Sequence, residues 1–160
     1  MRIRGGAALI LAALIVFPAS SFAQSVAGKA KVVDGDSLEI REHRIRLWGV
    51  DAPEFKQKCV RNKERWGCGY AATDALRRHL EGATVKCVTV DKDDYGRLVA
   101  KCSVNQRSVN EWLVREGWAM DYTRYSKGAY AGAQAKARSA RRGIWSGTFE
   151  TPERYRHRPR

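Results

Sequence analysis

The order of strand-like and helix-like segments limits the possible folds of this chain more than any other feature of its sequence. Five short, β-branched-rich runs bounded by Asp, Gly or charged turns are typical of strands: residues 26–33, 37–42, 44–50, 84–90 and 98–104. Three other segments are typical of helices and are each followed by a glycine: residues 71–80, 108–116 and 130–142. Because strands dominate the first half and helices the second, without alternating, we expect an α+β fold built on a small barrel rather than a doubly wound parallel sheet.

The first 23 residues have the pattern of a secretory signal peptide. Two arginines precede an apolar stretch at residues 7–17, and residues 21–23 supply the small side chains that a signal peptidase reads. An uncleaved membrane anchor is the weaker alternative, because the apolar stretch is shorter than the ~20 residues of a spanning helix. We therefore expect residues 1–23 to be removed, no membrane span, and a secreted or periplasmic protein. One domain, at residues 24–147, suits a chain of 160 residues.

The chain is strongly basic, with 30 Lys plus Arg against 17 Asp plus Glu and a formal net charge of +13. The excess is concentrated at residues 124–160, which contain ten basic and two acidic residues. Such a surface attracts polyanions, either nucleic acid or an anionic envelope surface. A basic tail that only keeps a secreted protein soluble is the alternative. Residues 148–160, with two prolines and alternating arginines, are expected to form a basic disordered tail.

The four cysteines are compatible with two disulfides or with one metal site. Cys87 and Cys102 lie on two expected strands, and a hairpin centred between residues 94 and 95 makes them direct cross-strand partners. The second bridge, Cys59–Cys68, follows by elimination. A four-thiolate zinc site usually needs C-x-x-C pairs, which this sequence lacks. In the oxidising compartment that an exported protein enters, two disulfides are therefore expected.

Two acidic segments contain the residues best suited to chemistry: Asp34-Gly35-Asp36-Ser37 and Asp51-Ala52-Pro53-Glu54. The carboxylates of the first segment, at i and i+2, can point to the same side, and its glycine lets the backbone approach a ligand closely. In the second segment the proline fixes the turn that presents Glu54. Acidic oxygens from two strand ends are what a hard cation such as Ca²⁺ requires. Taken singly, each segment is weak evidence, because the first is a common turn and the second is as often a helix start.

Arg46 and Arg97 are candidate positively charged residues of the same site as the two acidic segments. In the run that contains Arg46, Ile45 and Leu47 are expected to face the core, so that Arg46 points the other way. Arg97 follows Tyr95, whose ring is a candidate for stacking or hydrogen bonding. Two guanidinium groups and a carboxylate-held cation suit a phosphodiester. For either arginine alone, a solvated strand residue is the simpler interpretation.

Five motifs together resemble the successive signatures of the thermonucleases, the staphylococcal-nuclease-like proteins. They occur in the family's order and cover roughly residues 26–145: Asp34-Gly35-Asp36-Ser37, Arg46-Leu47-Trp48-Gly49-Val50-Asp51-Ala52-Pro53-Glu54, Asp94-Tyr95-Gly96-Arg97, Val109-Asn110-Glu111-Trp112-Leu113-Val114-Arg115-Glu116-Gly117 and Gly143-Ile144-Trp145. Any one block means little, but five in order are specific.

The resemblance implies a five-stranded OB-type β-barrel with three α-helices, and a Ca²⁺-dependent phosphodiesterase that acts on DNA and RNA to leave 3′-phosphate ends. Carried over by position, the calcium ligands would be the carboxylates of Asp36 and Asp51 and the carbonyl oxygen of Ala52, with Asp34 acting through water. Glu54 would orient or deprotonate the attacking water, and Arg46 and Arg97 would hold the phosphate. Whether Tyr122 or Tyr125 stacks on the nucleotide stays open.

The expected protein is thus a monomeric nuclease without a stable protein partner that prefers single-stranded substrates. The alternative is a catalytically silent nucleic-acid-binding OB-type module, because some relatives of this fold bind without cleaving. A third possibility is a structural envelope protein whose basic tail adheres to an anionic surface. The presence of both acidic segments, Glu54 and both arginines favours the nuclease, since a binding module has no need of a metal site.

Overall fold

The computed structural model describes residues 24–158, and its main sheet has the topology of a small barrel. The sheet contains β1 (Ser25–Gly28), β8 (Val85–Lys92), β9 (Leu98–Val104), β4 (His43–Leu47), β3 (Ser37–Ile40) and β2 (Ala30–Asp34), paired in that order. Only Lys29 separates β1 from β2, so one nearly continuous segment of chain supplies both the first and the last strand of the sheet. In addition, β1 contacts β3. Counted as one strand, this segment completes the expected five-stranded OB-type barrel, and the expected α+β class is confirmed.

Within the barrel, β4 and β9 pair in parallel, whereas the other strand pairs are antiparallel. Short strands extend this framework. β10 (Arg107–Ser108) pairs with β9, β5 (Val50–Asp51) pairs with β11 (Met120–Asp121), and β6 (Cys59–Arg61) forms a hairpin with β7 (Glu64–Trp66). The β5–β11 pair joins the end of the β4 region to the helical half of the chain.

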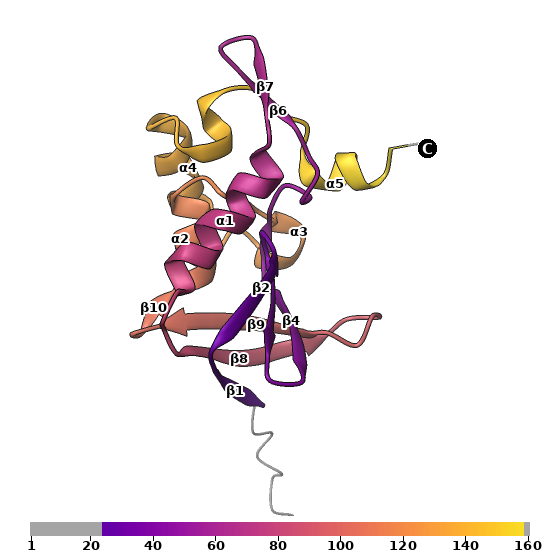
Figure 1. Cartoon of the computed structure of the whole chain (residues 1–160), viewed down its shortest axis with the longest axis vertical. Coiled ribbons are helices and arrows are strands. Elements are labelled where there is room, and N and C mark those ends of the chain that lie inside the picture. The colour runs from indigo at the N-terminus through magenta and orange to yellow at the C-terminus, as the bar shows by residue number, and fades with distance from the viewer. Residues whose placement is uncertain (1–23, 159–160) are drawn as a thin grey trace, which may run out of the picture.

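The three predicted helices are present as α1 (Cys68–Leu80), α2 (Val109–Arg115) and α4 (Ala131–Ser139), and all three lie on the same side of β8 and β9 in Figure 1. Ala72, Leu76 and Leu80 recur every four residues along α1 and are buried, which gives this helix one apolar face. Three short helices were not predicted: α3 (Thr123–Ser126), the 3₁₀ helix η1 (Gly143–Ser146) and α5 (Pro152–Arg156).

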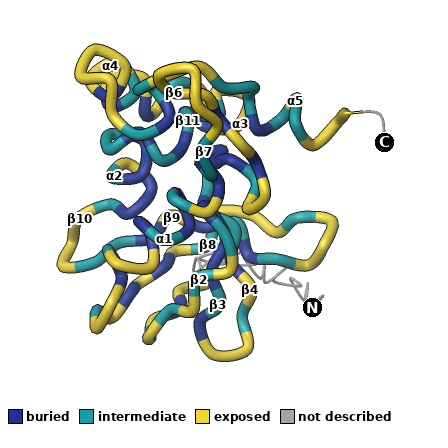
Figure 2. The backbone as a smooth tube through the Cα atoms, turned by 45° about the horizontal axis from the view of Figure 1, so that its top comes forward, coloured by how far each residue is buried: buried dark blue, intermediate teal, exposed yellow. Residues whose placement is uncertain are grey.

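The core lies between the barrel and the three longer helices α1, α2 and α4. Figure 2 shows buried backbone there, surrounded by exposed turns. On β4 the expected alternation is confirmed, because Ile45 and Leu47 are at most 1% exposed while Arg46 between them is only partly covered. Gly117 follows α2 as expected, whereas α4 ends at Ser139 and Gly143 instead begins η1; their φ values are 74° and 50°. Their backbones touch, and a Cβ on Gly117 would lie 2.3 Å from the carbonyl oxygen of Arg142, so a larger residue does not fit there.

Both predicted disulfides, Cys59–Cys68 and Cys87–Cys102, are confirmed. The cross-strand register at Cys87 and Cys102 is the expected one, but the hairpin is centred on Tyr95 rather than between residues 94 and 95. A register shift between Thr89 and Asp91 makes up the difference. Cys59 and Cys68 connect the β6–β7 hairpin to the first turn of α1.

The two ends of the chain differ from the expectations in different ways. The predicted signal peptide, residues 1–23, lies outside the described residues. The expectation of a disordered tail at residues 148–160 is wrong for the part that the structure describes, because Thr151 caps the ordered helix α5 and Pro152 is buried at its start. Pro152 favours a helix here because proline suits the first helical position. Between residues 24 and 158, no helix combines the length and the apolar character needed to cross a membrane.

Candidate active site

A cavity of about 790 Å³ opens where the strand ends, the β8–β9 turn, the region of α3 and the helix α5 meet. Six of the seven predicted site residues line it: Asp34, Asp36, Arg46, Ala52, Glu54 and Arg97. The seventh, Asp51, is 3% exposed and is hydrogen-bonded to two arginines of the lining. The fold therefore gathers segments from residues 34, 46, 54 and 97 into one place.

Asp36 and Asp51 are positioned by strand pairing and by one glycine. Asp36 lies in the turn between β2 and β3, and Asp51 ends β5. The backbone N–H of Ala52 donates to Oδ2 of Asp36 over 2.9 Å, which links the two acidic segments directly. A Cβ on Gly35 would lie 2.7 Å from the Cβ of Ala52, so the segments can approach this closely only because position 35 is glycine.

Arg46 connects the two buried carboxylates. Its guanidinium donates to Oδ1 of Asp36 and, over 3.2 Å, to Oδ1 of Asp51. Burial, with Asp34 and Asp51 nearby, raises the pKa of Asp36 from 3.8 to about 7, although Arg46 and the Ala52 N–H act to lower it. An ionised Asp36 therefore depends on a neighbouring positive charge.

Glu54 lies at the edge of the cavity, where its side chain is 37% exposed. Its backbone N–H donates to Oε1 of the fully buried Gln57 over 3.1 Å, and Nε2 of Gln57 donates to the carbonyl oxygen of Glu150 over 2.7 Å. These bonds hold the turn through the backbone of Glu54, so its partly exposed carboxylate is not needed to maintain the turn.

Arg97 enters the cavity from the β8–β9 turn. Its Nε donates to Oδ2 of Asp93 over 2.7 Å, and its backbone N–H donates to Oδ1 of the same residue over 2.9 Å. Its guanidinium carbon lies 5.6 Å from the ring centroid of Tyr95. Asp93 thus orients Arg97, and the guanidinium of Arg97 lies over the Tyr95 ring.

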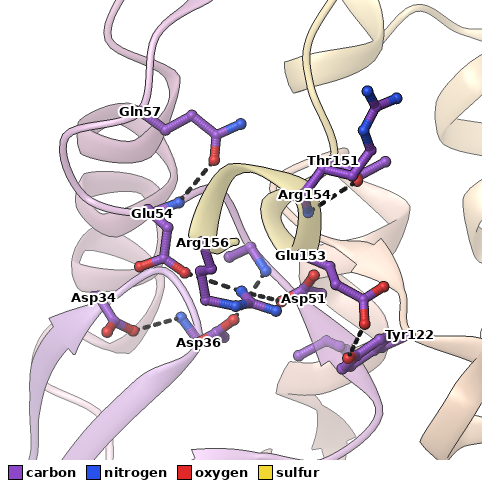
Figure 3. A network of polar contacts seen from close by, with 12 residues as sticks. Asp34, Asp36, Asp51, Glu54, Gln57, Tyr122, Thr151, Glu153, Arg154 and Arg156 are labelled. Carbon is purple, nitrogen blue, oxygen red and sulfur yellow. Dashed lines mark hydrogen bonds and ion pairs between the residues drawn. The ribbon is translucent and has the colours of Figure 1, made fainter. Parts of the chain in front are cut away.

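Arg156 of α5 is a site residue that the sequence analysis missed, having assigned it to a disordered tail. Its Nη1 donates to Oδ1 of Asp51 over 2.8 Å and to Oε1 of Glu54 over 2.9 Å, at the centre of the network in Figure 3. Although burial acts against its charge, these hydrogen bonds raise the pKa of Arg156 above its usual range. Alternating arginines near the C-terminus were the only signal, and they do not indicate which one reaches the cavity.

The family model for staphylococcal nuclease homologues matches residues 44–147, well over half of the chain. The chain belongs to this family. The matched segment contains Arg46, Asp51, Glu54 and Arg97, and it lies within the domain expected at residues 24–147. Membership places the protein, in its broad class, among the hydrolases that cleave nucleic acid.

Several relatives align with most of this staphylococcal nuclease homologue. The succinoglycan biosynthesis protein ExoI of Rhizobium meliloti (strain 1021) is 37% identical over 139 residues, which cover 85% of this chain and 73% of that protein. An uncharacterized endonuclease of Escherichia coli O157:H7 is 33% identical over 135 residues, or 80% of this chain and 82% of its own length. The probable staphylococcal-like nuclease CAN2 of Oryza sativa subsp. japonica is 33% identical over 119 residues, but the alignment covers only 30% of that protein.

The donor atoms of this homologue fit a hard divalent cation in their chemistry, because they are all oxygens and include two buried carboxylates. In this structure the Oδ1 atoms of both carboxylates already accept hydrogen bonds from arginines. Arg46 donates to Asp36 and to Asp51, and Arg156 donates to Asp51. Within residues 24–158 no group of three or more His, Cys, Asp or Glu side chains is arranged to hold a metal ion. A cation bound here would therefore take part of its coordination from the Ala52 carbonyl oxygen and from water.

Tyr122 and Tyr125, the two candidates for stacking on the nucleotide, both line the cavity. Their rings meet edge to face with centroids 5.0 Å apart, and Tyr125 is 54% exposed. The hydroxyl of Tyr122 donates to Oε1 of Glu153 in α5 over 2.9 Å. Tyr125 therefore has the freer ring for stacking on a base.

Proposed function

We propose that this protein is a calcium-dependent nuclease that hydrolyses phosphodiester bonds in DNA and RNA and leaves 3′-phosphate ends. The observation that carries the proposal is the meeting of Asp36, Asp51, Glu54, Arg46 and Arg97 at one cavity in a member of the staphylococcal nuclease family. The names of the endonuclease and nuclease relatives support the same activity.

Each residue has a defined role in the proposed reaction. The cation would be held by Asp36, Asp51 and the carbonyl oxygen of Ala52, with Asp34 acting through water, and would supply Lewis acidity toward a phosphate oxygen. Glu54 takes a proton from the attacking water, whose oxygen bonds to phosphorus while the bond to the 5′-oxygen breaks. Arg46 and Arg97 stabilise the negative charge that develops on the phosphoryl oxygens. The phosphate then stays on the 3′-oxygen.

The proposed substrate is single-stranded nucleic acid. An unstacked base can lie against an exposed aromatic ring, and such stacking does not depend strongly on sequence. Tyr125 offers this ring at the cavity wall, beside Arg124. The proposed enzyme acts as a monomer.

Activity with and without calcium is the experiment that tests the proposal. Hydrolysis of single-stranded DNA and RNA should require calcium, stop on addition of a chelator and yield 3′-phosphorylated products. Binding without hydrolysis in calcium would favour the silent nucleic-acid-binding module. If the protein neither binds nor hydrolyses nucleic acid, the result would favour a structural envelope protein.

We expect Asp36→Asn and Asp51→Asn each to weaken calcium binding by at least about tenfold, because each removes an anionic oxygen from the proposed ligand set. In either variant the remaining carboxylate still pairs with Arg46, so the fold should persist. Calorimetric calcium titration measures the affinity. Asp91→Asn is the control, since Asp91 lines the same cavity but is outside the ligand set. Equal affinities in all four proteins would remove both residues from the set.

We further propose that the protein is exported, to the periplasm or beyond, after removal of residues 1–23. The pattern of the N-terminal residues and the two disulfides support this proposal. N-terminal sequencing of protein recovered from outside the cytoplasm should begin at or near Gln24. A chain that keeps its N-terminus and stays in the cytoplasm would contradict it.

A further inference from the structure

The C-terminal helix α5 contacts the active-site cavity at two separate points. Arg156 bridges Asp51 and Glu54, the proposed metal ligand and the proposed base, through a single nitrogen. Glu153, three residues earlier, accepts a hydrogen bond from the hydroxyl of Tyr122. The helix therefore engages both the acidic side of the cavity and its aromatic side, and Glu153, Arg156 and His157 form part of the lining.

The position of Arg156 conflicts with the proposed chemistry. Asp51 has to face a cation, and Glu54 has to face water, but in this structure a guanidinium of the same chain neutralises both. The Arg156 side chain is 30% exposed, while the Asp51 side chain is 5% exposed. A calcium ion that takes Asp51 as a ligand therefore competes with a positive charge already in place.

Two features of α5 allow it to detach from the cavity: its short length and the way in which it is attached. It has five residues, and helices this short are not stable by themselves in water. The Thr151 cap lies within its own first turn, so its attachment comes from the buried Pro152, the Tyr122–Glu153 hydrogen bond, the Arg124–Glu153 ion pair and the Arg156 ion pairs. Loss of the Arg156 ion pairs removes the contacts that join its C-terminal end to Asp51 and Glu54, and the Arg158–Glu150 pair that remains lies within the segment that contains the helix.

We propose that α5 is an internal latch on the active site, in which Arg156 takes the place of the metal cation between Asp51 and Glu54 until calcium displaces it. The latch rests on the proposed calcium site. It makes metal binding and opening of the cavity a single event, because the residues that bind calcium are those that hold the helix. Calcium affinity is then set by the population of molecules in which Arg156 has left its partners.

Calorimetric titration with calcium alone tests the latch without measuring activity. If Arg156 is closed in nine of ten molecules, Arg156→Gln should bind calcium about tenfold more tightly than the unaltered protein. Arg154→Gln removes the same charge from the same helix at an exposed position outside the cavity lining, so its calcium affinity should be unchanged. Arg156→Lys, which keeps a competing cation, should stay close to the unaltered protein.

Hydrogen exchange of residues 150–158 gives a second measurement. Calcium should speed exchange in this segment of the unaltered protein, whereas in Arg156→Gln exchange should be fast with or without calcium.

Calcium affinity in Arg156→Gln that equals or falls below that of Arg154→Gln would overturn the latch and leave the nuclease proposal standing. Unchanged or slower exchange in calcium would overturn it as well. If neither the unaltered protein nor Arg156→Gln binds calcium, the metal site fails together with the latch, and the chelator experiment on activity then reports on the nuclease proposal separately.

Discussion

Replacing Glu54 with glutamine is expected to lower kcat by about 10²- to 10⁴-fold, the usual contribution of a general base. Glutamine has nearly the same shape but cannot accept a proton from the attacking water. The Glu54 side chain is 37% exposed, and the hydrogen bond that holds its turn involves its backbone N–H rather than its carboxylate. The substitution should therefore leave the barrel intact, although it weakens one of the two ion pairs of Arg156.

Steady-state kinetics on single-stranded DNA in saturating calcium measure this effect. Glu64→Gln is a suitable control, because Glu64 is exposed on the β6–β7 hairpin and outside the cavity lining. A kcat for Glu54→Gln within a few-fold of that control would mean that Glu54 does not take the proton. The water would then have to be activated in another way.

Arg97→Ala should reduce kcat at saturating substrate by about 10²- to 10³-fold, with a smaller effect on KM, because charge builds on the phosphoryl oxygens only as the bond breaks. Arg97 is well suited to this test. Its side chain pairs with Asp93 at the partly exposed turn, so its loss leaves no deeply buried charge behind. Arg107→Ala, at an exposed site outside the lining, is the control. If Arg97→Ala raised KM and left kcat unchanged, Arg97 would serve binding alone.

Arg46 has a structural role in addition to its proposed catalytic one. It is the partner of two carboxylates whose side chains are at most 5% exposed. Removing one member of a buried ion pair typically lowers the free energy of unfolding by about 3–5 kcal/mol. In Arg46→Ala, Asp36 loses its guanidinium partner, whereas Asp51 keeps its contact with Arg156. Loss of activity in Arg46→Ala would therefore combine a structural effect with a catalytic one. Arg97 separates the two.

Local patterns were sufficient for most of the fold and for the acidic part of the site. β-Branched alternation located the barrel strands, and the spacing of apolar residues located α1, α2 and α4. Cys87 and Cys102 paired as expected because the register shift between Thr89 and Asp91 offsets the different centre of the hairpin, and Cys59 and Cys68 are only nine residues apart. Asp36 and Asp51 flank neighbouring strands within about fifteen residues of sequence, so a short stretch of chain already brings them together.

The tertiary structure decided where the distant groups lie. Parallel pairing of β4 with β9 sets Val99 beside Arg46, and this brings the turn that contains Arg97 to the cavity. Sequence periodicity predicts strands but not which strands become neighbours. The register shift between Thr89 and Asp91 was also beyond local pattern, because it depends on how the two strands fit the curved sheet.

Arg156 shows the same limit most clearly. It is 105 residues from Asp51 in sequence, and its segment is polar and rich in arginine, which by composition predicts disorder. The sequence by itself determined the individual strands, the three longer helices and the acidic segments, because these depend on interactions between residues close together in the chain. Only the tertiary structure showed that α5 packs against the cavity, because a five-residue helix derives its stability from the surface on which it packs.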